Sequence, residues 1–297
     1  MTSLICVVLI LCTASITVAQ SDYLPVVLWH GMGDSCCNPS TMGRIKNLIQ
    51  EQHNGTYVVS IMIGNSIIAD EESSFLGNAN DQVAFVCEKL QADPELSGGY
   101  HAIGFSQGGQ FLRAVAQRCP SPPMVNFATL GSQHQGVFGF PTCDNFTEPF
   151  CEDLRLVLSQ GAYLPGLQNH VIQAQYWHDP LDEAGYRQGN IFLPDINQEN
   201  TINESYKQNL LALENLILVL FLQDITVIPR ESSWFGFYKP GQDIELQTLQ
   251  ESVLYTEDRL GLKALDEAGK LHFLTSDGGH MHYTDEWFIE NILPYLT

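Results

Sequence analysis

Basic residues are scarce in this chain of 297 residues. Thirteen lysines and arginines stand against 34 aspartates and glutamates, which gives a formal net charge of −21 at pH 7. A protein that binds nucleic acid needs a basic surface to replace the phosphate counterions. The composition therefore argues against nucleic acid as a partner, and the acidity itself indicates solubility rather than a particular ligand.

Long apolar runs, zinc motifs and repeats are also missing from the sequence. No uninterrupted apolar run reaches the roughly 20 residues that a membrane-spanning helix needs, so we expect no stable membrane span. There is no Cys-x-x-Cys pair of the kind that holds structural zinc, and there is no low-complexity linker. We therefore expect one domain without a bound metal or cofactor.

The first 20 residues contain no charged side chain. Residues 4–11 are apolar, and they are followed by the small-x-small sequence Thr17-Val18-Ala19. This pattern is typical of a secretory signal peptide, which predicts removal of residues 1–19 and a mature chain of residues 20–297. An N-terminal membrane anchor is the alternative, but the apolar stretch is short for it.

Cysteines and glycosylation sequons agree with secretion. Cys6 and Cys12 leave with the signal peptide, so six cysteines remain: Cys36, Cys37, Cys87, Cys119, Cys143 and Cys151. An even number in a secreted chain predicts disulfides, although six cysteines leave 15 pairings open. Three Asn-x-Ser/Thr sequons, at Asn54, Asn145 and Asn203, predict glycosylation.

Strand-like and helix-like segments alternate through the first half of the chain. This alternation predicts an α/β fold with a parallel sheet covered by helices on both faces. Residues 138–209 depart from the rhythm and predict a cap-like insertion within a single domain. The expected strands are 25–29, 57–63, 100–105, 125–130, 216–222 and 271–275, and the expected helices are 80–90, 107–118 and 284–293.

Residues 104–108 carry the sequence G-x-S-x-G. An expected strand enters the motif and an expected helix leaves it. In that context the small residues Gly104 and Gly108 permit a sharp strand-to-helix turn, which exposes the hydroxyl of Ser106 at the carboxyl edge of the sheet. Ser106 is therefore the predicted nucleophile, with a helix-capping serine as the structural alternative.

A serine nucleophile needs a base and an orienting carboxylate. In this type of fold the chain order is Ser, acid, His. His280 follows the last expected strand and is favoured over His282, which lies next to the last helix. Asp224 follows the strand 216–222 and is the leading acid; Asp179 and Asp195, both in the insertion, are the alternatives.

The tetrahedral intermediate needs two backbone N–H donors for its oxyanion. One is expected from Gln107, the residue after the nucleophile. The other is expected from the loop after the first strand, where Met32 stands between two glycines.

Three long segments resemble the palmitoyl-protein thioesterases, lysosomal α/β-hydrolases that remove fatty acyl groups from S-acylated cysteines. They are residues 27–39, 104–120 and 231–238, and the resemblance covers essentially the whole mature chain. It implies the catalytic triad Ser106, Asp224 and His280, with the oxyanion donors Met32 and Gln107. It also implies the disulfides Cys36–Cys37, Cys87–Cys119 and Cys143–Cys151, and glycosylation at Asn203 more clearly than at Asn54 or Asn145.

The resemblance further implies the substrates and the compartment. S-palmitoylated proteins or peptides and long-chain acyl thioesters, including acyl-CoA, are the expected partners. The expected location is the lysosome, reached through a glycan-dependent sorting receptor, with secretion as the alternative. One local departure is that His280 follows Gly278-Gly279, where the family usually has Gly-Asp.

The acyl chain needs a long apolar groove, which we expect from the insertion and the loop after Asp224. Candidates are Ile225, Val227, Ile228, Trp234, Phe235 and Phe237, although each could equally be a core residue. Three other functions remain open: a secreted serine lipase or oxyester esterase, a related acyl-CoA thioesterase, and a silent hydrolase fold that carries lipid or protein.

Overall fold

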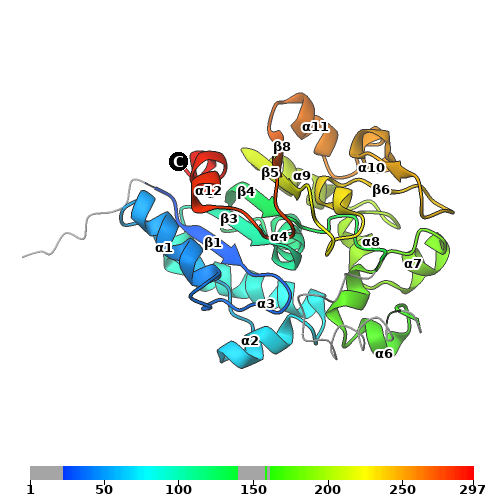
Figure 1. Ribbon diagram of the computed structural model, residues 1–297, viewed down its shortest axis with the longest axis horizontal. Coiled ribbons are helices and arrows are strands. Elements are labelled where there is room, and N and C mark those ends of the chain that lie inside the picture. Colours follow the sequence, from blue (N-terminus) through cyan, green and yellow to red (C-terminus); the bar gives the residue numbers. More distant parts are fainter. Residues whose placement is uncertain (1–22, 140–157, 159–160) are drawn as a thin grey trace, which may run out of the picture.

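The centre of the protein is a six-stranded sheet with the strand order β2-β1-β3-β4-β5-β8 (Figure 1). The computed structural model describes residues 23–139, 158 and 161–297. Each neighbouring pair of strands in this sheet runs parallel. The strands are β1 (Val26–Trp29), β2 (Val58–Ser60), β3 (Tyr100–Phe105), β4 (Met124–Leu130), β5 (Asn215–Phe221) and β8 (Leu271–Ser276).

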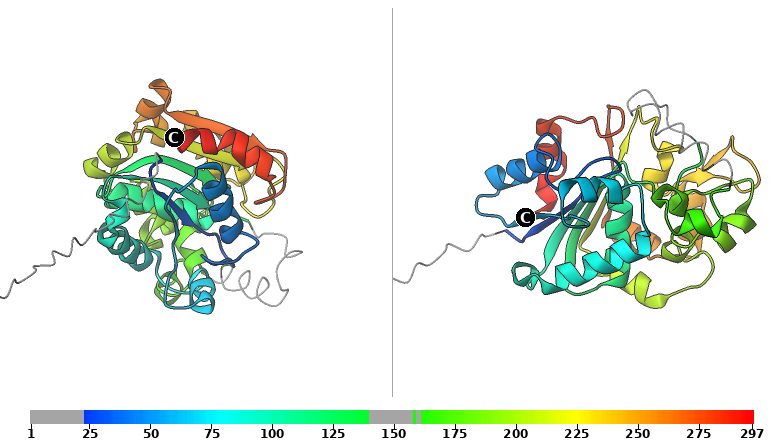
Figure 2. Two further views of the ribbon diagram at one scale, coloured as in Figure 1. Left: turned by 90° about the vertical axis from the view of Figure 1, so that its left-hand side faces the viewer. Right: turned by 90° about the horizontal axis from the view of Figure 1, so that it is seen from below.

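Helices cover both faces of this sheet. Successive side chains of a strand point to opposite faces, and here the side chains on both faces are apolar and need to be buried. Val26 and Leu28 of β1 pack in one core together with α1 (Met42–Gln52) and α12 (Asp285–Asn291). Val27 and Trp29 pack in the opposite core with α3 (Ala79–Ala92) and α4 (Gln107–Arg118). Figure 2 shows these two helical layers with the sheet between them. The structure confirms the predicted α/β class.

The segment between β4 and β5 holds several short helices. They are α6 (Pro165–Gln168), η3 (Ile172–Tyr176), α7 (Glu183–Gly189), α8 (Leu193–Ile196) and α9 (Glu204–Leu211). Figure 1 places α6, α7 and α8 at the side of the molecule away from α1 and α12. The bounds 138–209 for an insertion stay a prediction.

A second excursion, which the sequence did not predict, separates β5 from β8. It contains η4 (Arg230–Trp234), a two-stranded antiparallel ribbon of β6 (Phe237–Tyr238) and β7 (Leu246–Gln247), η5 (Leu249–Glu251), α10 (Val253–Thr256) and α11 (Leu262–Glu267). The remaining elements within the described residues are α2 (Ile67–Ser73), η1 (Pro94–Leu96) and η6 (Leu293–Tyr295).

Two disulfides join residues that the family resemblance had paired. One links Cys36 to its neighbour Cys37, and the other links Cys87 of α3 to Cys119 at the end of α4. The predicted signal peptide, the pair Cys143–Cys151 and the sequon at Asn145 lie outside the described residues. Among the residues that are described, no helix is both long and apolar enough to cross a bilayer.

The two described sequons differ in local structure. Asn203 caps the N-terminus of α9, is exposed, and its side-chain oxygen accepts hydrogen bonds from the backbone N–H and the hydroxyl of Ser205. Asn54 is exposed in the turn after α1, but Thr56 of the same sequon is buried. Glycosylation at both positions stays a prediction.

Candidate active site

Ser106 occupies the sharp turn between β3 and α4. Its backbone has φ 51° and ψ −122°, a strained conformation for a residue with a side chain. The neighbouring glycines allow this turn because there is no space for a side chain at either position. A Cβ on Gly104 would stand 2.2 Å from the Cα of Gly109, and one on Gly108 would stand 2.2 Å from the carbonyl oxygen of Trp29. The G-x-S-x-G pattern thus lets strand and helix meet closely enough to project the serine outward.

Gly104→Ala should destabilise the protein by at least about 3 kcal/mol, because the added methyl group would push the start of α4 away from β3. Gly98→Ala is the matched control, since nothing lies within 4 Å of a Cβ at that position. Urea unfolding monitored by circular dichroism compares the two variants. Equal stability of the two proteins would contradict the proposed close packing of the turn.

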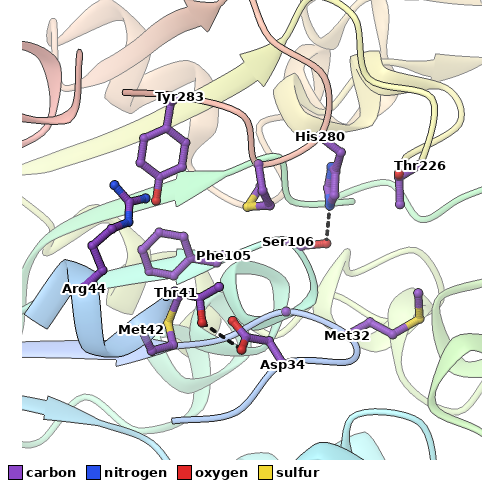
Figure 3. A pocket seen from close by; sticks show the side chains of 12 residues that line it. Met32, Asp34, Thr41, Met42, Arg44, Phe105, Ser106, Thr226, His280 and Tyr283 are labelled. Atoms are coloured by element: carbon purple, nitrogen blue, oxygen red, sulfur yellow. Dashed lines mark hydrogen bonds between the residues drawn. The ribbon is translucent and has the colours of Figure 1, made fainter. Parts of the chain in front are cut away.

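The side chains of Ser106, His280 and Asp224 form a continuous hydrogen-bonded chain. The Ser106 hydroxyl lies 2.9 Å from Nε2 of His280 (Figure 3), and Nδ1 of His280 lies 2.6 Å from Oδ2 of Asp224. The other carboxylate oxygen of Asp224 accepts from the backbone N–H groups of Thr226 and Val227. The Asp224 side chain is fully buried, so this carboxylate can hold the imidazole in one orientation.

The alternative acid and base residues lie elsewhere. Asp195 forms an ion pair with Arg118, and Asp179 accepts a hydrogen bond from the backbone N–H of Leu181. His282 is exposed, and its backbone forms hydrogen bonds with Gly279 and Ser276 in the loop that carries His280. Of the predicted residues, the structure therefore brings together Ser106, Asp224 and His280.

Ser74, which follows α2, forms hydrogen bonds with the loop of one expected oxyanion donor and with the side chain of the other. Its hydroxyl accepts from the backbone N–H of Gly33, beside Met32, and its carbonyl accepts from the side-chain amide of Gln107. Gln107 is the first residue of α4, so its own backbone N–H has no acceptor within the helix. Met32 and Ser106 line the same cavity. The arrangement suits an oxyanion hole, and that role stays a prediction.

A buried pair, His30 and Asp70, supports the loop that carries Met32. Nε2 of His30 lies 3.1 Å from Asp70, which is fully buried on α2 and also accepts from the backbone N–H groups of Cys36 and Ile63. Burial alone opposes the charge on His30. The hydrogen bond and charge of Asp70, with the carbonyl of Gly31, outweigh burial and raise the pKa of His30 above its ordinary value.

The His30–Asp70 pair should contribute more to the stability of the fold at mildly acidic pH than at alkaline pH. A raised pKa in the folded state means that the stabilisation is complete below the unfolded pKa of about 6.5 and is lost as the pH rises through the folded value. The unfolding free energy of the wild type should therefore exceed that of His30→Gln by more at about pH 5.5 than at about pH 8.5. A difference that is constant or grows with pH would contradict a charged pair.

An apolar cavity lies under the β4–β5 segment next to Ser106. Its walls include Val137, Leu158, Tyr176 and Trp177, together with Val227 from the loop after Asp224. Val227 was among the residues expected there, but Trp234, Phe235 and Phe237 line other cavities. Phe235 stacks on His134, and Phe237 stacks on His178. The expectation that these aromatics form the acyl groove at Ser106 was wrong.

Sequence reasoning missed the residues that support the site from a distance. Asp70 and Ser74 stand some 40 residues after the loop that they hold, and no spacing rule links them to it. The sequence does not set Asp70 apart, because it is the first of three consecutive acidic residues, Asp70-Glu71-Glu72. Within the described part of the chain, no group of three or more His, Cys, Asp or Glu residues is placed to hold a metal ion.

A parallel sheet with a nucleophile elbow after β3 and with acid and base on the loops after β5 and β8 defines the α/β-hydrolase class. Within it, the family model described as palmitoyl protein thioesterase matches residues 25–280. The chain is 51% identical over 291 residues to palmitoyl-protein thioesterase 1 of Caenorhabditis elegans, covering 96% of this chain and 97% of that protein. The chain belongs to the palmitoyl-protein thioesterase family and is thus a thiolester hydrolase.

Other proteins show more distant similarity. Palmitoyl-protein thioesterase 3 of Dictyostelium discoideum is 35% identical over 294 residues, which cover 97% of each chain. Among solved structures, a lipase of Bacillus licheniformis in its mature form matches 94% of this chain and 95% of its own, with 14% identity and a TM-score of 0.47.

Proposed function

We propose that this protein removes long-chain fatty acyl groups from S-acylated cysteines by acyl transfer to Ser106. The observation that carries the proposal is the hydrogen-bonded chain from Ser106 through His280 to Asp224, in a member of the palmitoyl-protein thioesterase family. Nothing in the triad itself separates thioesters from oxyesters. Family membership provides that distinction.

The reaction has two halves. His280 takes the proton of Ser106 as the serine oxygen attacks the thioester carbonyl, and the backbone N–H groups of Met32 and Gln107 hold the oxyanion. The carbon–sulfur bond then breaks, and His280 gives its proton to the departing sulfur. In the second half a water molecule gives a proton to His280 and attacks the carbonyl of the acyl-serine. The ester bond to the serine oxygen then breaks and His280 gives its proton to that oxygen, which releases the fatty acid and restores Ser106.

The substrate is proposed to place its acyl chain in the apolar cavity beside Ser106. Val137, Tyr176 and Trp177 supply a wall without charged side chains, which suits a hydrocarbon chain. Proteins or peptides that carry palmitoyl-cysteine, and acyl-CoA, would provide such chains.

The compartment proposed is the lysosome, reached through the secretory pathway. A mouse relative, 28% identical over 256 residues, is named a lysosomal thioesterase. The predicted signal peptide, the two disulfides and the exposed sequon at Asn203 support passage through an oxidising compartment. A sorting receptor that reads the glycans would then direct the protein to the lysosome.

The test compares an S-palmitoyl-cysteine peptide with the O-palmitoyl-serine peptide of the same sequence. We expect the secreted wild-type protein to hydrolyse the thioester faster, with Ser106→Ala as the blank. Hydrolysis of the oxyester alone would identify a lipase or esterase instead. Hydrolysis of neither substrate would favour a carrier.

A further inference from the structure

Two cavities meet at Ser106. The acyl-side cavity is the one already described, with Val137, Tyr176 and Trp177 in its walls. The second, of about 140 Å³, runs from Ser106 toward α1 and contains His280 in its wall. We call it the thiol-side cavity. Met32, Ser106 and Thr226 line both cavities, so a substrate bound at Ser106 can extend into each.

The position of His280 indicates which part of the substrate enters each cavity. Once the Ser106 oxygen and the oxyanion are fixed, the tetrahedral carbon has two remaining directions, one for the acyl chain and one for the leaving sulfur. The sulfur must lie next to Nε2 of His280, because that nitrogen returns the proton. Since His280 lines the thiol-side cavity and does not line the acyl-side cavity, the leaving thiol belongs in the former.

Both apolar and polar side chains line the thiol-side cavity. The apolar side chains of Phe105, Met42 and Met281 form part of the wall. Figure 3 shows Arg44 and Tyr283 together at the far end from Ser106, with Asp34 and Thr41 between the two ends. Asp34 provides an acceptor and Arg44 provides several donors, a pairing that suits the N–H and C=O groups of a peptide backbone.

Arg44 is held in place by two partners that leave part of its guanidinium available. One nitrogen forms an ion pair with Asp285 at the start of α12, and the guanidinium carbon lies 5.6 Å from the centre of the Tyr283 ring. A guanidinium has five N–H donors, so donors remain for a ligand. Burial raises the pKa of the Tyr283 phenol, so Tyr283 stays neutral beside Arg44.

We propose that the thiol-side cavity binds the cysteine residue of an S-acyl peptide, with Arg44 donating hydrogen bonds to a backbone carbonyl or carboxylate of the peptide and Tyr283 limiting the length of the cavity. This proposal rests on the proposed thioesterase function. It assigns Arg44 as a specificity residue that recognises the peptide and leaves recognition of the acyl chain to the other cavity.

The experiment measures kcat/KM for two thioesters that share the palmitoyl group, an S-palmitoyl-cysteine peptide and S-palmitoyl-N-acetylcysteamine. The second substrate keeps one amide group but lacks the carbonyl of the cysteine and the rest of the peptide backbone, which are the groups assigned to Arg44. Arg44→Ala should lower kcat/KM for the peptide about tenfold and leave the cysteamine thioester within about twofold, since a hydrogen bond to a charged group is lost with one substrate only. An equal loss for both substrates, or no loss for either, would overturn the proposal.

Two control variants separate recognition from support of the fold. Asp285→Asn removes the ion pair that joins α1 to α12 but keeps Arg44, so the peptide-to-cysteamine ratio should stay within about twofold of the wild type. If Asp285→Asn lost kcat/KM for the peptide as selectively as Arg44→Ala does, Arg44 would act only by joining α1 to α12, and the proposal would be overturned.

Trp177→Leu, in the acyl-side cavity, should change the preference between palmitoyl and decanoyl peptides without changing the peptide-to-cysteamine ratio. If Trp177→Leu changed the peptide-to-cysteamine ratio and left the preference between palmitoyl and decanoyl peptides unchanged, the assignment of the two cavities would be overturned. Failure of the wild type to hydrolyse either thioester would instead reject the proposed function, so the two failures are distinguishable.

Discussion

Ser106→Ala should reduce kcat for the palmitoyl thioester by on the order of 10⁵- to 10⁶-fold. The variant loses the nucleophile, while the cavities on both sides of it remain. The residual rate would come from the oxyanion donors and from substrate binding alone. Steady-state hydrolysis of the S-palmitoyl peptide measures the loss, and mass spectrometry of rapidly quenched wild-type protein should find the acyl group on the peptide that contains Ser106.

The matched control is Ser97→Ala, a serine exposed at the end of η1 whose hydroxyl donates only to the carbonyl of Pro94. Its kcat should equal that of the wild type. The Ser106 variant should also keep its thermal midpoint, because replacement removes an oxygen and leaves the strained backbone in place. A Ser106→Ala protein that is folded and retains more than about one hundredth of the wild-type rate would contradict covalent catalysis by this residue.

The sheet and the triad could be predicted because their signals are local or ordered along the chain. The apolar runs before Gly104 and before Asp224 are short segments that become buried parallel strands, and the residue that follows such a strand must lie at the carboxyl edge of the sheet. Three residues that each follow a parallel strand are therefore expected to meet at one edge, as Ser106, Asp224 and His280 do.

The residues that line the cavities could not be predicted in the same way. Phe235 and Phe237 lie close to Asp224 in sequence, but the second excursion turns them toward His134 and His178 rather than toward Ser106. Their direction depends on how η4 and the β6–β7 ribbon fold back, and aromatic composition carries no information about that. Arg44 lies on α1 and lines the cavity next to Ser106. The amphipathic pattern of α1 predicts which face is buried, but it does not predict which residues its polar side chains contact.

Support for the loop that carries Met32 is non-local for the same physical reason. Asp70 and Ser74 hold residues of the loop after β1 through single hydrogen bonds, and each contact depends on how α2 packs beside that loop. A sequence pattern identifies the two segments but does not place one against the other. The loop that carries Met32 therefore depends on α2 for its shape, and its stability should follow the protonation of His30.

Asp224→Asn is the second replacement with a large expected effect, a loss of about 10⁴-fold in kcat with little change in stability. The amide oxygen of asparagine can still accept the hydrogen bonds from the backbone of Thr226 and Val227, which keeps the loop in place. The amide no longer stabilises the imidazolium and favours the wrong tautomer of His280.

The alternative acids provide the controls for this replacement. Asp179→Asn and Asp195→Asn remove carboxylates that contact the backbone of Leu181 and the side chain of Arg118, and both should keep kcat within about threefold of the wild type. Hydrolysis rates and thermal midpoints of the three variants decide among the candidates. A larger loss in either control than in Asp224→Asn would move the acid of the triad out of the loop after β5 and into the β4–β5 segment.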